Sequence, residues 1–214
     1  GGVWFSLIDK VASKQNLMAA VKQVAANKGS AGVDRVTVER FLEQADEEVE
    51  KLHRGLQGGT YRPQAIRRHY IPKLGSKELR PLGIPTVRDR AVQTALRNVL
   101  EPIFERTFAE HSYGFRPEKG CKDALRWVDQ LLTGGYTWVV DADLKSYFDT
   151  IPHERLMALV RERVADGRVL ELIESFLDQP ILEELKEWTP TEGTPQGAVV
   201  SPLLANVYLN PLDH

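Results

Sequence analysis

The stretch Val139-Val-Asp-Ala-Asp-Leu-Lys-Ser-Tyr-Phe-Asp149 decides how this chain of 214 residues can be interpreted. Two β-branched residues lead into it, and three carboxylates, Asp141, Asp143 and Asp149, lie around an aromatic pair. Because alternate side chains of a strand share one face, about 7 Å apart, the pattern predicts a buried strand that carries Asp141 and Asp143 to its carboxyl end. Crowded carboxylates of this kind are suitable ligands for Mg²⁺. Solvated loop residues or helix caps are the alternative interpretation.

The composition indicates a folded, water-soluble protein. Hydrophobic residues make up 42% and charged residues 27% of the chain, enough for one large domain or two small lobes with a sizeable core. No apolar run approaches the ~20 residues that cross a bilayer, and no secretory leader is recognisable. We therefore expect a cytoplasmic protein without a membrane partner. The single cysteine, Cys121, excludes an internal disulfide framework and a cysteine-based zinc site.

The net charge of −2 hides a strong division along the chain. Residues 51–126 contain 16 Lys and Arg against 7 Asp and Glu, a net charge of +9, whereas the remainder carries −11. A concentrated basic region is typical of a surface that binds a nucleic-acid backbone.

A two-stranded ribbon is predicted inside this basic region. Residues 61–73 alternate as a strand does, residues 74–78 favour a turn, and residues 79–84 fit a returning strand. Arginine can bind a phosphate in a bidentate manner and lysine as a point charge. The ribbon carries such cations at Arg62, Arg67, Arg68, Lys73, Lys77 and Arg80. A solvated edge hairpin protected by its charges is the structural alternative.

Helices are predicted for most of the remaining chain, because apolar residues recur there at helical spacing. The predicted helices lie near residues 17–26, 41–56, 86–104, 119–132, 154–160 and 169–177. Pro102 should kink or break its helix. Residues 181–188 fit a strand or a hairpin arm. Ser201 is the expected N-cap of a final helix, with Pro202 in its first position.

Six short motifs occur in the order typical of one protein family. They are Asn27-Lys-Gly-Ser-Ala-Gly-Val-Asp34, Ile71-Pro-Lys73, Arg80-Pro-Leu-Gly-Ile-Pro-Thr86, Ser112-Tyr-Gly-Phe-Arg-Pro117, Asp143-Leu-Lys-Ser-Tyr-Phe-Asp149 and Gly193-Thr-Pro-Gln-Gly197. Through them the chain resembles, over nearly its whole length, the retron-type or maturase reverse transcriptases encoded by bacterial group II introns. The resemblance implies a helix-rich α+β fold, the right-hand polymerase fold. Its fingers would be residues 1–135 and its incomplete palm residues 136–214.

The resemblance also implies a metal site. Asp143 matches the first catalytic aspartate of the palm, which binds Mg²⁺, and the Leu144 carbonyl would be a second oxygen ligand. Asp141 and Asp149 match no such role, so structural interpretations are favoured for both.

Further residues match positions that bind the incoming nucleotide and the template. Lys73 and Arg80 would clamp the triphosphate, and Phe148 would pack under the sugar and exclude a 2′-hydroxyl. Gln196 and Gly197 would line the nucleotide pocket. The template RNA would lie along a set of arginines, namely Arg62, Arg67, Arg68, Arg88, Arg90 and Arg116.

The implied function is RNA-directed DNA synthesis by two-metal nucleotidyl transfer, together with assistance to intron splicing and mobility. Template RNA, intron RNA, a DNA primer and dNTPs would be the partners, and a homodimer that covers an open palm edge is an open alternative. The family's Tyr-Ala-Asp-Asp motif, its thumb and its maturase region do not occur before His214, so we expect this chain alone not to polymerise. A non-catalytic RNA-binding module and a fragment of a CRISPR-associated reverse transcriptase are the alternative functions.

Overall fold

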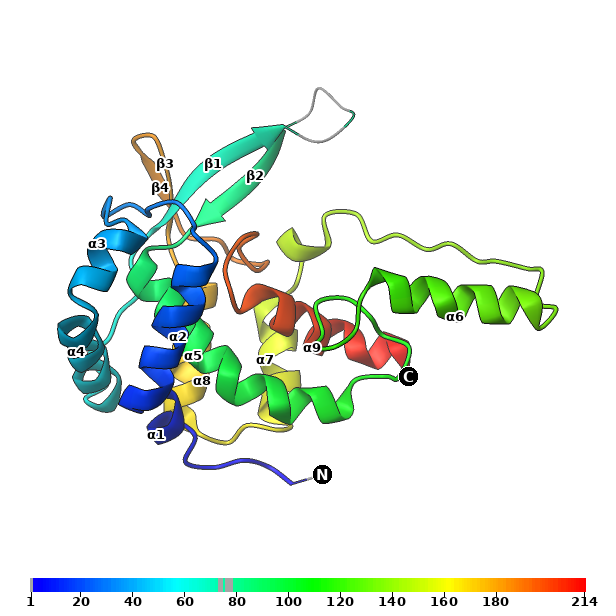
Figure 1. The fold of residues 1–214 in the computed structure, drawn as a ribbon, viewed down its shortest axis with the longest axis horizontal. Coiled ribbons are helices and arrows are strands. Elements are labelled where there is room, and N and C mark those ends of the chain that lie inside the picture. The colour runs from blue at the N-terminus through cyan, green and yellow to red at the C-terminus, as the bar shows by residue number, and fades with distance from the viewer. Residues whose placement is uncertain (1, 73–74, 76–78) are drawn as a thin grey trace.

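The computed structural model describes residues 2–72, 75 and 79–214, which form an α+β fold dominated by helices (Figure 1). The helices are α1 (Ile8–Val11), α2 (Lys14–Ala26), α3 (Val38–Glu43), α4 (Ala45–Gln57), α5 (Val87–Phe104), α6 (Cys121–Thr133), α7 (His153–Arg161), α8 (Gly167–Leu177) and α9 (Ser201–Asp213). The strands are β1 (Ile66–Pro72), β2 (Leu79–Ile84), β3 (Ile181–Glu183) and β4 (Lys186–Trp188). Among the described residues, none of the helices combines the length and the apolarity needed to cross a lipid bilayer.

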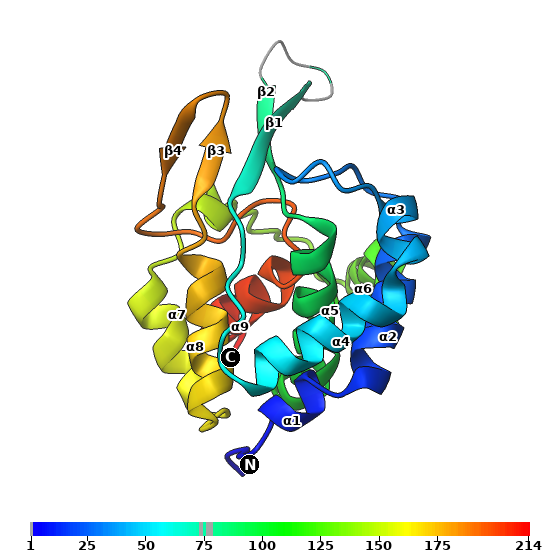
Figure 2. The same ribbon diagram turned by 90° about the vertical axis from the view of Figure 1, so that its left-hand side faces the viewer.

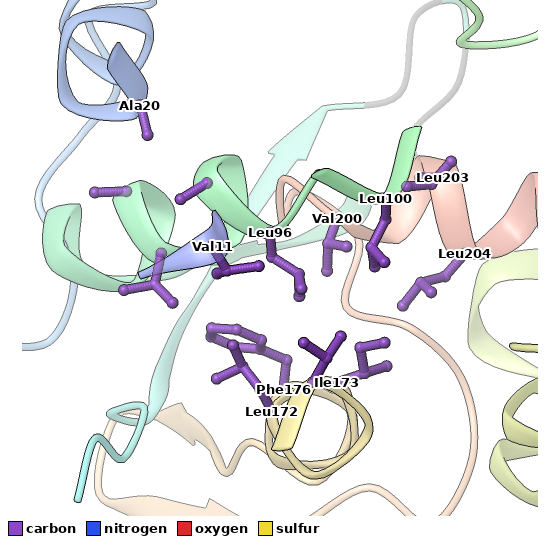
Figure 3. Close-up of a cluster of buried hydrophobic side chains, with 14 of the residues drawn as sticks. Val11, Ala20, Leu96, Leu100, Leu172, Ile173, Phe176, Val200, Leu203 and Leu204 are labelled. Atoms are coloured by element: carbon purple, nitrogen blue, oxygen red, sulfur yellow. The ribbon is translucent and has the colours of Figure 1, made fainter. Parts of the chain in front are cut away.

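Helix α5 lies at the centre of the hydrophobic core. Figure 3 shows Leu96 and Leu100 of α5 directed toward Ile173 and Phe176 of α8, with Leu204 of α9 beside them. Burying each such side chain stabilises the fold by about 1.5–3 kcal/mol. The core therefore joins helices of the predicted fingers to helices of the predicted palm, and the division of the chain at residue 135 stays a prediction.

Three details of the helices differ from the sequence-based expectations. Pro102 lies in the last turn of α5, which continues through it to Phe104, so the predicted break does not occur. The predicted helix over residues 41–56 is divided at Gln44, whose φ of −120° ends α3 before α4 begins. Helix α9 begins at Ser201 with Val200 as its N-cap, because the Ser201 hydroxyl instead donates a hydrogen bond to the Pro195 carbonyl at 3.0 Å.

The strands form one sheet in the order β2-β1-β3-β4, at one end of the molecule above the helices (Figure 2). Strands β1 and β2 are the predicted basic ribbon, paired antiparallel with Ile71 opposite Arg80. Residues 181–188 are confirmed as a hairpin, whose strand β3 runs parallel to β1. Lys73 and Lys77, which the sequence places near the tip of the ribbon, lie outside the described residues.

The prediction of a buried strand through Val139 and Asp143 is wrong. Residues 136–144 have no regular secondary structure in the described chain, and Trp138 and Val140 are 96% and 94% exposed. Figure 1 shows this segment returning in an extended path from the far end of α6, which projects from the helical body. The physical reason is that a strand needs a neighbouring strand for its N–H and C=O groups, and the described residues place none beside it.

Candidate functional site

Two segments distant in the sequence, residues 147–151 (the Phe148 segment) and the loop of residues 193–197, are held together beneath the sheet. The Thr194 amide donates to the Phe148 carbonyl at 2.6 Å, and the Gly193 amide donates to the Ile151 carbonyl at 2.8 Å. In addition, the Gln196 side-chain amide donates to the Asp149 carboxylate at 3.0 Å. The structure therefore brings together the predicted site residues Phe148 and Gln196.

This close approach requires glycine at two positions of the loop. Gly193 has a φ of +86°, and a Cβ there would lie 2.7 Å from the Asp149 carbonyl oxygen. Gly197 has a φ of +102°, and its Cβ would lie 2.5 Å from the Gly83 oxygen on β2. The Gly83 amide also donates to the Gln196 carbonyl at 2.7 Å. Residues 193–197 thus join the Phe148 segment to the basic hairpin.

His153 supports this loop from below and was not recognised in the sequence. Its Nε2 lies 2.7 Å from the Gly193 carbonyl oxygen. Because a carbonyl can only accept, the hydrogen atom of this hydrogen bond is on Nε2. Its Nδ1 lies 3.5 Å from an Asp178 carboxylate oxygen at the end of α8. No local pattern predicts these contacts, because both partners come from distant parts of the chain.

The Phe148 side chain lies in a small aromatic group. Its ring contacts the edge of Phe115 with centroids 6.2 Å apart, and Tyr147 lies 5.8 Å away. The Tyr147 hydroxyl donates to the Ala205 carbonyl at 2.6 Å, and burial raises the pKa of Tyr147 to about 12. Tyr147 therefore stays protonated and anchors the start of the Phe148 segment to α9.

A buried polar cluster anchors the base of the basic hairpin and was also missed. The fully buried Asp89 of α5 accepts hydrogen bonds from the Tyr61 hydroxyl at 2.6 Å and from the Gln64 amide at 3.0 Å. The Gln179 side-chain amide donates to the Gln64 carbonyl at 2.5 Å and lies 3.3 Å from Asp89. Burial raises the pKa of Asp89. The cluster ties the segment that leads into β1 to α5 and to the segment that follows α8.

The hairpin arginines differ in their freedom to bind a ligand. Arg80 is exposed on β2, and the Arg68 guanidinium lies 5.5 Å from the centre of the Trp188 ring. Arg67 donates to the Ala31 carbonyl at 2.7 Å, and the exposed Arg62 donates to the carbonyls of its own turn. Arg62, Arg68 and Arg80 are therefore the hairpin arginines best placed to contact a phosphate.

The other predicted template arginines are engaged within the fold. Arg88 forms an ion pair with Glu48; burial would raise the pKa of Glu48, but the hydrogen bonds from Arg88 and Lys51 lower it. Arg90 is buried and donates to the Ser30 carbonyl at 2.7 Å.

Arg116 is equally constrained. It is buried, contacts the Glu105 carboxylate at 2.6 Å, and donates to the carbonyls of Ala109 and Ser112 at 2.6 and 2.8 Å. Binding a phosphate would require it to give up these contacts. The contacts of Arg88, Arg90 and Arg116 stabilise the fold, and a template role for them stays a prediction.

The predicted metal ligands do not form a complete site. Asp143 and Leu144 lie on the exposed extended segment, and Asp141 is exposed as well. Within residues 2–72, 75 and 79–214, no group of three or more His, Cys, Asp or Glu side chains is placed to hold a metal ion. One carboxylate and one carbonyl would leave most of the octahedral positions of a Mg²⁺ ion to water and substrate phosphates. We therefore assign no reaction step to a metal in this arrangement.

Comparisons with known proteins agree with these motifs. The model of the family described as reverse transcriptase (RNA-dependent DNA polymerase) matches residues 71–214. The chain is 41% identical over 196 residues to the group II intron-encoded protein LtrA of Lactococcus lactis subsp. cremoris, covering 91% of this chain and 32% of that protein. It is 40% identical over 213 residues to protein YkfC of Escherichia coli (strain K12), covering 97% of this chain and 56% of that protein. The chain thus spans only part of these relatives.

A solved structure shows the same fold. The chain is similar to a chain of the partial Cas6-RT-Cas1–Cas2 complex, with a TM-score of 0.61 and 23% identity, over 97% of this chain and 34% of that one. At this level of identity the similarity concerns the fold alone.

Proposed function

Because this chain belongs to the reverse transcriptase (RNA-dependent DNA polymerase) family and is related to group II intron-encoded proteins, we propose that it forms the nucleotide- and template-binding part of an RNA-directed DNA polymerase. The observation that supports this most is the attachment of the Phe148 segment to the Gly193–Gly197 loop directly below a basic hairpin. That arrangement supports the proposal, because a wall for a nucleotide would then lie beside cations for its phosphates.

In this proposal the incoming dNTP lies between Phe148 and the loop. Phe148 packs under the sugar, and Gln196 and Gly197 line the pocket. Arg80, together with Lys73, neutralises the triphosphate, as cationic groups do in phosphoryl transfer. We propose Mg²⁺ as the divalent ion of the complete enzyme, with Asp143 and Leu144 among its ligands.

RNA is the proposed template, held by the hairpin through Arg62 and Arg68. The net charge of +9 over residues 51–126 supports this, because such a charge attracts a phosphate backbone. A DNA primer and intron RNA are the further proposed partners.

Arg80→Ala should weaken dNTP binding roughly 10–100-fold, because a hydrogen bond to a charged group contributes about 1.5–3 kcal/mol. Template binding should change by less than about threefold, since one of several phosphate contacts is lost. Titration of a fluorescent dNTP and of labelled RNA, each against the wild type and the variant, measures both quantities.

Arg97→Ala is the matched control, because Arg97 is an arginine of α5 whose guanidinium lies 3.5 Å from the side-chain oxygen of Gln23. The control should leave both affinities unchanged. Equal losses of dNTP and RNA affinity in Arg80→Ala would contradict the assignment of Arg80 to the triphosphate.

A non-catalytic RNA-binding module is the second candidate, supported by the concentration of charge in the hairpin region. Both candidates predict that RNA affinity falls with salt, because bound counterions are released. If about four phosphates are neutralised, affinity for single-stranded RNA should fall roughly 50-fold between 50 and 200 mM salt. Anisotropy titrations across that range test this expectation, and a flat response would exclude the hairpin as the RNA surface. The two candidates differ in dNTP binding: the non-catalytic RNA-binding module predicts that Arg80 binds no dNTP.

A further inference from the structure

A cavity of about 280 Å³ lies under the sheet and is lined in part by Gln196 and by Asp149, the residue that follows Phe148. Ile66 and Ile181 of the adjacent strands β1 and β3 form its apolar floor. Arg68 and Trp188 form one wall, and the loop that contains Gln196 forms the other. Of the described residues assigned to the nucleotide, Gln196 alone lines this cavity, whereas Phe148, Arg80 and Gly197 do not.

The wall formed by Arg68 and Trp188 has the chemistry of a base-stacking surface. The Arg68 guanidinium lies 5.5 Å from the centre of the Trp188 ring, and Trp188 is 39% exposed on the edge strand β4. Unpaired bases stack on aromatic rings and on guanidinium planes, and each such contact contributes about 1–3 kcal/mol. The floor is apolar because Ile66 and Ile181 have hydrocarbon side chains, and both residues are buried.

The charges around the cavity favour a base over a phosphate inside it. Asp149 and Glu192 both line the cavity, and their carboxylates would repel a phosphate. The same carboxylates can accept hydrogen bonds from the amino groups of a base. Arg80 on β2 and Arg62, which precedes β1, do not line the cavity.

We propose that this cavity binds one unpaired base of single-stranded template RNA, stacked against Trp188 and Arg68. The proposal rests on the proposed function, because it specifies how the template is held beside the nucleotide site. Gln196 and Asp149, whose hydrogen bond joins the two segments, both line this cavity.

The test compares a short single-stranded RNA with an abasic strand of the same length, which keeps the phosphates but lacks the bases. Wild-type protein should bind the RNA roughly tenfold more tightly than the abasic strand, and Trp188→Ala should remove that difference while leaving the abasic affinity unchanged. Trp188→Phe, which keeps a ring, should retain most of the difference. The slope of affinity against salt should be the same in all three proteins, because Trp188 contacts no phosphate.

Trp138→Ala is the matched control, because that ring is 96% exposed and lies outside the cavity; it should behave as the wild type. If Trp188→Ala does not fold, Ile181→Phe narrows the same cavity from its floor and should cause the same selective loss. Equal weakening of both strands, or no weakening, would overturn the base pocket. A wild-type protein that binds neither strand would instead overturn the proposed function, on which the pocket rests.

Discussion

Gly193→Ala should strongly destabilise the protein. The new Cβ would lie 2.7 Å from the Asp149 carbonyl oxygen and 2.9 Å from the Asp149 Cα, which are backbone atoms that cannot rotate away. A residue with a side chain at a φ of +86° also costs about 1–2 kcal/mol, and such overpacking adds about 1–3 kcal/mol. The expected total of about 3 kcal/mol lowers the melting temperature by roughly 6–12 °C.

Gly135→Ala separates the two contributions. Gly135 has a similar φ of +96°, but a Cβ there would have no atom within 4 Å among the described residues. The control should therefore show only the conformational cost, and thermal unfolding followed by circular dichroism should place its melting point clearly above that of Gly193→Ala. Equal melting points would mean that the loop does not press against Asp149.

Gly193→Ala should also weaken dNTP binding in the protein that remains folded. The Gly193 and Thr194 amides hold the Phe148 segment. Displacing the loop should therefore move both the loop itself and Phe148, which are the two walls of the proposed nucleotide pocket. Titration with a fluorescent dNTP at a temperature below the transition measures this effect separately from stability.

Local patterns in the sequence were sufficient to predict most of the secondary structure. The apolar repeat of residues 169–177 predicts α8, and the alternation on both sides of residues 74–78 predicts the β1–β2 hairpin. Both features depend on side chains close together in the sequence, where periodicity is informative. The weaker pattern of residues 181–188 favoured a strand or a hairpin arm, and these residues form the β3–β4 hairpin.

Residues 136–144 show where local patterns fail. Their β-branched residues favour a strand, but strand formation depends on a neighbouring strand, whose presence cannot be inferred from the segment itself. The described residues place no strand beside Val139 and Val140, so the segment stays exposed. The same argument explains why Asp141 and Asp143 are not held on one face of a sheet.

The candidate site was predictable in its parts and not in its assembly. The motifs around Arg80, Phe148 and Gln196 were recognised individually. The structure shows that the amides of residues 193 and 194 connect the loop to the Phe148 segment, and that the Gly83 amide connects β2 to Gln196. His153 was not recognised, because its partners Gly193 and Asp178 are 40 and 25 residues away. Arg116 was assigned to the template because its charge is visible in the sequence and its partner Glu105 is not identifiable there.

Asp166→Ala should cause a loss of stability as large as that of Gly193→Ala. The Asp166 side chain connects the N-terminal segment at the start of α1 to the start of α8. One Asp166 oxygen accepts hydrogen bonds from the Leu7 and Ile8 amides at 2.6 and 2.9 Å. The other accepts from the Arg168 and Val169 amides at 3.1 and 3.2 Å, which caps α8. A lost cap costs about 1 kcal/mol, and buried amides left without a partner cost about 1–3 kcal/mol more. The total of about 3 kcal/mol corresponds to a decrease of roughly 6–12 °C in melting temperature.

The pH dependence of stability tests the role of the Asp166 charge. Burial alone would raise the pKa of Asp166, but the four backbone amides outweigh it and hold the pKa below its usual value. Because the folded-state pKa is lowered, the stabilisation is present above the unfolded-state pKa of about 3.9 and is lost as the pH falls through the folded-state value. Asp166→Asn keeps one acceptor without the charge, so it should be less stable than the wild type at pH 7, and this difference should shrink below about pH 4. Asp9→Asn, at an exposed carboxylate of α1, is the control and should follow the wild type throughout. If the difference in stability between wild type and Asp166→Asn is constant from pH 7 to pH 3, the negative charge of Asp166 does not contribute to the stabilisation by these amides.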